Sequence, residues 1–98
     1  MGTETGKIRF VVIIQTNLLN KIHPSTIICP ITTNVKASAK ILRVQLKKCE
    51  ANMNEDCDIM VDQIRAIDNK RLLRKVGELP KTHRDKLKEN LKIVIDMD

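Results

Sequence analysis

Residues 9–15, Arg-Phe-Val-Val-Ile-Ile-Gln, decide the fold together with residues 25–32, Ser-Thr-Ile-Ile-Cys-Pro-Ile-Thr. Both stretches are short and rich in β-branched apolar residues, which is typical of buried strands. The first is apolar almost throughout, so we expect it to be buried on both faces. The second contains Pro30, which cannot donate a hydrogen bond within a sheet and so predicts an edge or a bulge there.

The rest of the chain predicts more strands and one final helix. Residues 41–46 alternate, which predicts that Leu42, Val44 and Leu46 face inward. Residues 57–68 and 74–79 add strand patterns, Asp68 could cap the turn at 69–72, and residues 1–7 are polar enough for a loop. After Pro80, Thr82 and Asp85 resemble a capping box, and the apolar stripe of the helix comprises Leu87, Leu91, Val94 and Ile95. We therefore expect a mainly β protein over residues 1–98, a single domain with a small curled antiparallel sheet and a C-terminal helix.

Positive charge is concentrated in the first half of the sequence. Residues 1–50 carry eight Lys and Arg against two acidic residues, a net of +6, whereas residues 51–98 carry ten of each sign. Such an imbalance favours a polyanionic partner, first of all nucleic acid. Phe10 is the only aromatic residue, so stacking platforms of the kind that many single-strand RNA binders use are excluded.

Other kinds of site find little support. The three cysteines contain no C-x-x-C pair, which favours reduced thiols over a disulfide framework or a zinc site, and we expect no metal and no cofactor. Two separated histidines, His23 and His83, do not predict a two-histidine ribonuclease. The carboxylates of Glu55, Asp56, Asp58 and Asp62 could hold a cation, but a solvated loop explains them better. The longest apolar run, residues 10–14, is too short for a membrane span or a signal peptide.

Arg9 is the most promising functional side chain. It stands at the mouth of a buried strand, and Thr32 and Thr33 end the next strand. If these strand ends meet, a guanidinium and two hydroxyls would suit a phosphate, because the planar guanidinium can donate two parallel hydrogen bonds. Spacing alone leaves an ordinary salt bridge to Glu4 equally acceptable.

Three ordered motifs resemble the MazF/PemK family of toxins. Residues 2–12, G-T-E-T-G-K-I-R-F-V-V, are similar to the family pattern G-S-E-Q-x-G-x-R-P-V-V. Residues 26–33 correspond to a family strand that ends in a threonine pair. Residues 56–68, D-C-D-I-M-V-D-Q-I-R-A-I-D, are similar to D-S-x-x-x-x-[DE]-Q-[IV]-R-[TS]-I-D. The resemblance spans nearly the whole chain.

The resemblance implies a homodimeric, cytoplasmic, metal-independent endoribonuclease that cuts single-stranded RNA at specific sequences. It implies a fold of the CcdB/PemK/MazF type and an acidic antitoxin as partner. Arg9 and Thr32 would match the catalytic arginine and threonine, and Glu4 would be a base or an RNA-positioning group. The RNA-binding residues would be Thr3, Thr33, Lys36, Lys40, Arg43, Cys57, Asp62 and Gln63, with Lys21 also lining the RNA track.

Three departures from the family pattern leave alternatives open. The family normally has about a dozen residues before the first motif, forming the first strand; they are missing here, so either the sequence is truncated or one edge of the sheet is absent. Phe10 replaces a proline, and Thr5 and Cys57 replace a glutamine and a serine. The alternatives are a relative that binds antitoxin or RNA without cleaving, and a gyrase-poisoning toxin of the same fold.

Overall fold

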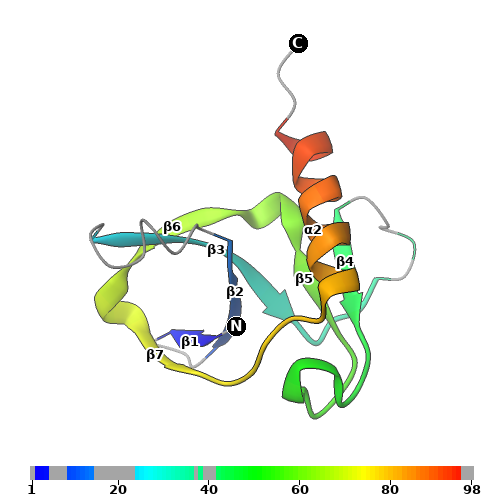
Figure 1. Ribbon diagram of the computed structural model, residues 1–98, viewed down its shortest axis with the longest axis horizontal. Helices are drawn as coiled ribbons and strands as arrows, with labels where there is room; N and C mark the ends of the chain where they lie inside the picture. The colour runs from blue at the N-terminus through cyan, green and yellow to red at the C-terminus, as the bar shows by residue number, and fades with distance from the viewer. Residues whose placement is uncertain (1, 5–8, 15–23, 37, 39–41, 96–98) are drawn as a thin grey trace.

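A computed structural model describes residues 2–4, 9–14, 24–36, 38 and 42–95. Within these ranges the chain forms seven strands, three short 3₁₀ turns and a C-terminal helix (Figure 1). The strands are β1 (Gly2–Glu4), β2 (Arg9–Ile13), β3 (Ser25–Thr32), β4 (Arg43–Leu46), β5 (Cys57–Met60), β6 (Arg65–Asp68) and β7 (Leu72–Lys75). The 3₁₀ turns are η1 (Glu50–Asn52), η2 (Val61–Gln63) and η3 (Asn69–Arg71), and the helix is α2 (Lys81–Val94).

The strands form one curled antiparallel sheet in the order β4-β5-β3-β2-β1-β7, with β6 also paired to β3. Strand β3 is the centre of this arrangement. One of its edges pairs with β2, whereas the other pairs with β6 along residues 25–28 and with β5 at residues 31–32. In Figure 1 the sheet curls around on the β1, β6 and β7 side, and α2 lies over β4 and β5. The predicted fold class is confirmed.

Two hydrophobic clusters hold the sheet in this shape. The larger one lies between α2 and the β4–β5 end, where Val44, Leu46, Ile59 and Leu87 are almost completely buried. The smaller one joins β2, β3 and β6 through Val11, Ile28 and Ile67. Because Val11 and Val12 belong to different clusters, β2 is buried on both faces, as its uninterrupted apolar run predicts.

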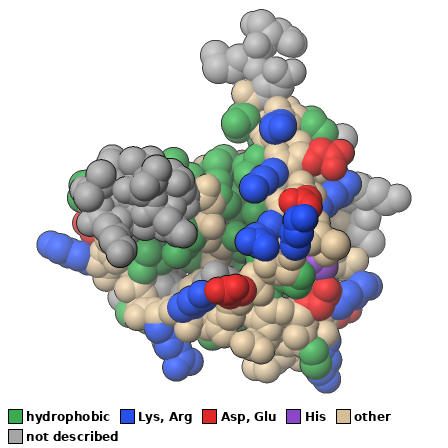
Figure 2. All heavy atoms as spheres, viewed as in Figure 1, with side chains coloured by type: hydrophobic (Ala, Val, Ile, Leu, Met, Phe, Trp, Pro, Cys, Tyr) green, Lys and Arg blue, Asp and Glu red, His purple; other side chains and the backbone are tan. Residues whose placement is uncertain are grey.

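Helix α2 packs through the predicted stripe but begins differently. Leu87 is buried, and Leu91 and Val94 pack against the larger cluster, whereas Ile95 lies just past the helix and is 58% exposed. The predicted capping box is wrong: the helix starts after Pro80, without a side-chain cap. Figure 2 shows Lys and Arg side chains along the outward face of this helix.

Pro30 corrects a second expectation, because β3 is an inner strand. The Ile14 N–H donates to the Ile27 oxygen, so the polar backbone groups of odd-numbered β3 residues face β2. The nitrogen of Pro30 therefore faces the other edge, at the point where the β6 ladder has ended and the β5 ladder begins. A missing donor costs little at this junction.

Other element boundaries also differ from expectation. Residues 2–4 form a strand between β2 and β7 rather than a loop. The stretch 57–68 is divided by η2 into β5 and β6, and the last strand is residues 72–75 rather than 74–79. Asp68 caps the next turn as predicted, accepting the Lys70 N–H at 2.9 Å. Leu42 is exposed, so the inward alternation of β4 holds only for Val44 and Leu46.

Candidate functional site

The strand register aligns the residues expected at a phosphate site. Strand β1 pairs Glu4 with Arg9 on β2, and β2 pairs Val11 with Pro30 on β3. Continuing the second register by two residues places Arg9 opposite Thr32, at the end of β3. Opposed residues of an antiparallel pair present their side chains to the same face. Arg9, which is exposed, and Thr32, which is half-buried, thus share one face of the sheet, with the Glu4 position next in the row.

A tight turn after β3 fixes the Thr32 hydroxyl. The Asn34 N–H donates to Thr32 Oγ1 at 3.1 Å, which is the usual way a threonine hydroxyl closes a turn. This contact uses a lone pair of the oxygen and leaves the single O–H of Thr32 able to donate to an anion. Thr33, the next hydroxyl, is exposed.

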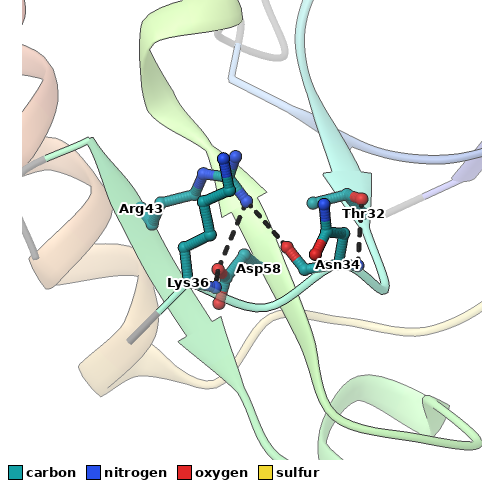
Figure 3. A network of polar contacts seen from close by, with 5 residues as sticks. All are labelled: Thr32, Asn34, Lys36, Arg43 and Asp58. Carbon is teal, nitrogen blue, oxygen red and sulfur yellow. Dashed lines mark hydrogen bonds and ion pairs between the residues drawn. The ribbon is translucent and has the colours of Figure 1, made fainter. Parts of the chain in front are cut away.

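Asp58 lies beside this turn (Figure 3). It lies opposite Thr32 in the β3–β5 register, and its side chain is only 1% exposed. Its Oδ2 accepts the Lys36 N–H at 2.8 Å and lies 3.4 Å from Arg43 Nη1. Arg43 Nη1 also donates to the Asn34 oxygen at 3.1 Å. The buried carboxylate therefore ties the turn and the start of β4 together.

Sequence reasoning placed Asp58 in a solvated loop, and this is wrong. Among the four carboxylates suspected as a cation site, Asp58 is buried, Asp56 accepts the Lys48 N–H at 2.7 Å, and Asp62 lies exposed in η2. Within the described ranges, no three His, Cys, Asp or Glu side chains are grouped so that they could hold a metal ion. The sequence offered one sign of this: Asp58 stands between two apolar residues, Cys57 and Ile59, in a predicted strand, where a buried carboxylate would need a hydrogen-bond partner.

The remaining predicted RNA-binding residues are distributed unevenly. Lys36 is exposed beside the turn, Arg43 has 16% of its side chain exposed, and Asp62 and Gln63 are exposed in η2. The side chain of Cys57 is 1% exposed and belongs to the larger core cluster, which argues against contact with RNA. Lys21 and Lys40 lie outside the described residues, and of Thr3 only the place in β1 is described.

The two buried thiols are poor nucleophiles at neutral pH. Burial, and secondarily the negative charge of Asp62, raises the pKa of Cys29 to about 11. Burial, with the charges of the nearby carboxylates led by Asp58, raises the pKa of Cys57 to about 11 as well. Because the thiolate is the reactive form, these residues serve packing rather than chemistry.

His83 has a structural environment rather than a catalytic one. Its Nε2 lies 3.3 Å from Glu50 Oε2, and Glu50 Oε1 accepts the Lys47 N–H at 2.7 Å. These contacts join the start of α2 to the turn containing η1. His23, the other histidine, lies outside the described residues. Within the described residues, no helix is long and apolar enough to cross a membrane.

A curled antiparallel sheet with a C-terminal helix and a row of polar residues across its strands defines a small class of mainly β proteins. The family model described as "PemK-like, MazF-like toxin of type II toxin-antitoxin system" matches residues 1–95. The chain therefore belongs to this family, as its three motifs indicated.

Individual relatives agree with this assignment. The chain is 31% identical over 93 residues to endoribonuclease EndoA of Bacillus subtilis (strain 168), a match that covers 95% of this chain and 80% of the relative. Among solved structures, the Mycobacterium tuberculosis toxin MazF-mt6 is similar with a TM-score of 0.85 and 22% identity, covering 99% of this chain and 95% of that one. An endoribonuclease in complex with its cognate antitoxin, from a mycobacterial species, gives a TM-score of 0.80 at 14% identity, covering 99% and 92%. The two structural matches establish the fold.

Proposed function

We propose that this protein is a toxin endoribonuclease, a single domain over residues 1–98 that cuts single-stranded RNA at specific sequences without a metal ion. The observation that carries the proposal is the strand register, which pairs Glu4 with Arg9 and, when the β2–β3 register is continued by two residues, sets Arg9 opposite Thr32. The family membership and the relative named as an endoribonuclease support the same activity.

In this mechanism the ribose 2′-hydroxyl attacks the adjacent phosphorus, and the bond to the 5′-oxygen of the next nucleotide breaks. The products are a 2′,3′-cyclic phosphate and a 5′-hydroxyl, so a proton leaves the 2′-oxygen and another reaches the 5′-oxygen. Arg9 donates N–H groups to the phosphoryl oxygens as negative charge develops, and it is our candidate to protonate the leaving oxygen. Thr32 donates its hydroxyl to the same phosphate. Groups that stabilise a transition-state charge in this way typically contribute about 3–4 kcal/mol each.

The proton of the 2′-hydroxyl needs an acceptor, and Glu4 is our candidate, as a base or as an RNA-positioning group. Its backbone lies next to Arg9 in the β1–β2 ladder. A carboxylate at this position could accept a hydrogen bond from a ribose hydroxyl.

The RNA itself would be held by charge and hydrogen bonds, since the chain has one aromatic residue. Lys36, Arg43, Thr33 and the Thr3 and Lys40 positions would contact the RNA, and exposed Asp62 and Gln63 would pair with base edges. We further propose that the toxin acts in the cytoplasm as a homodimer and that an acidic antitoxin neutralises it. The net charge of +6 suits both RNA and an acidic protein partner.

Cleavage of long single-stranded RNA in the presence of EDTA tests this proposal. We expect cuts at a short recurring sequence, with 5′-hydroxyl and cyclic phosphate ends, and their loss in Arg9→Ala. The matched control is Arg74→Ala, which removes an exposed arginine from β7 and should cut like the parent. No cleavage by a folded protein would refute the enzyme and favour a relative that only binds.

A further inference from the structure

We propose that Arg43 binds a phosphate group of the RNA through a guanidinium fork that Asp58 holds in place. The inference deepens the proposed function, because it rests on RNA being the ligand. It assigns to Arg43 the recognition of the backbone rather than of a base, and to Asp58 a positioning role.

The described contacts of the Arg43 guanidinium use one of its three nitrogens. Both contacts of the guanidinium with described residues, to Asp58 Oδ2 and to the Asn34 oxygen, involve Nη1. A guanidinium has five N–H donors, of which Nη1 carries two. No described residue contacts the remaining edge, made by Nε and Nη2, and its two parallel N–H groups have the geometry that matches two oxygens of one phosphate.

The charge around Arg43 is positive overall. Arg43 and Lys36 are two cations beside one carboxylate, Asp58, and that carboxylate is buried. In Figure 3 the Lys36 side chain extends in the direction of the Arg43 guanidinium. The excess positive charge favours an anion over a neutral base edge.

Buried Asp58 restricts the Arg43 side chain. An arginine on a surface strand normally samples many rotamers and loses that freedom when it binds. Here a carboxylate that is 1% exposed and an Asn34 carbonyl fix Nη1 before any ligand arrives. Asp58 also accepts the Lys36 N–H, so the same carboxylate fixes the Arg43 guanidinium and the turn that follows β3. Preorganisation of this kind raises affinity by reducing the entropy lost on binding.

The binding test uses an RNA that cannot be cut, a 2′-O-methyl oligonucleotide containing the preferred cleavage sequence. Arg43→Lys keeps the charge but loses the fork, and we expect its dissociation constant to rise about tenfold. The matched control, Arg84→Lys on the exposed face of α2, should bind like the parent. Unchanged affinity of Arg43→Lys would overturn the proposal.

Sequence dependence separates phosphate from base recognition. A phosphate contact predicts that Arg43→Lys weakens binding to every oligonucleotide of a single-base substitution series by the same factor. It also predicts unchanged cleavage sites in long RNA. Relaxed specificity at one position would show instead that Arg43 contacts a base, and would overturn the assignment.

The role of Asp58 is tested by coupling. Asp58→Asn preserves shape and an acceptor for the Lys36 N–H but removes the charge facing Arg43. We expect it to weaken binding severalfold in the parent and less than twofold in the Arg43→Lys background. If Asp58→Asn weakens RNA binding by the same factor in both backgrounds, Asp58 does not position Arg43. If Asp58→Asn does not fold, Arg43→Lys still decides the phosphate assignment. RNA binding without cleavage would contradict the proposed enzyme while leaving this inference intact.

Discussion

Replacing Thr32 with valine removes one hydroxyl while keeping nearly the same volume. In the structure this oxygen accepts the Asn34 N–H at 3.1 Å, and in the proposed mechanism its O–H donates to the scissile phosphate. The variant therefore loses a turn hydrogen bond and a donor to the transition state, two effects that can be measured separately.

The two losses differ in size. The turn contact lies at an exposed site, where water can replace the lost acceptor, so the free energy of unfolding should fall by about 1 kcal/mol. The lost donor acts where charge develops during the reaction, and removing one such donor typically lowers the rate by about 10²–10³-fold. Activity should thus fall far more than stability.

The assay is single-turnover cleavage of a labelled RNA, with urea unfolding of the same samples. Thr32→Ser retains the hydroxyl and should recover most of the rate. Thr82→Val, which removes an exposed threonine hydroxyl on α2, is the matched control and should cut like the parent. A rate for Thr32→Val within threefold of the parent would refute the assignment of Thr32.

Two further predictions concern stability. Leu87→Ala, at the α2 contact with the larger cluster, should lower the free energy of unfolding by about 2–5 kcal/mol. Ile93→Ala, at a position 51% exposed on the same helix, should change it by less than about 1 kcal/mol. Equal losses of the two variants in urea unfolding would contradict the packing of α2. Raising the pH from about 9 to about 11 should also destabilise the protein, because unfolded thiols ionise near 9.0 while Cys29 and Cys57 remain protonated until about 11. The folded state then binds more protons, so each thiol lowers the free energy of unfolding by about 1.4 kcal/mol per pH unit in this range. Cys29→Ala should reduce this slope of the free energy of unfolding against pH, and an unchanged slope would contradict the raised pKa of Cys29.

The sequence predicted the elements whose patterns are local. Residues 25–32 form a strand with the predicted bounds, because a short run rich in β-branched residues between turns is typical of a strand. The burial of Leu87 on α2 was predicted for a similar reason, because apolar residues at the helical period mark the face that packs against the core. The capping box failed because Pro80 already starts the helix, leaving Thr82 inside it.

What the sequence could not predict depends on contacts between distant segments. The partners that hold Asp58, the Arg43 side chain and the Lys36 N–H, lie 15 and 22 residues away in the sequence. Likewise, Arg9 and Thr32 were named through a family resemblance, and their alignment needed the strand register. Sequence spacing alone does not determine which residues of two strands oppose each other.

The most direct test of the account is a pair of RNAs that differ at one atom. One contains the preferred cleavage sequence, and the other has a single 2′-deoxy nucleotide on the 5′ side of the scissile phosphate. The account predicts that the parent protein cuts the first RNA in EDTA, that Arg9→Ala cuts it at least about 10²-fold more slowly, and that the second RNA is bound but not cut. Cleavage of the 2′-deoxy RNA at the same phosphate would contradict attack by the ribose hydroxyl at the site formed by Arg9 and Thr32.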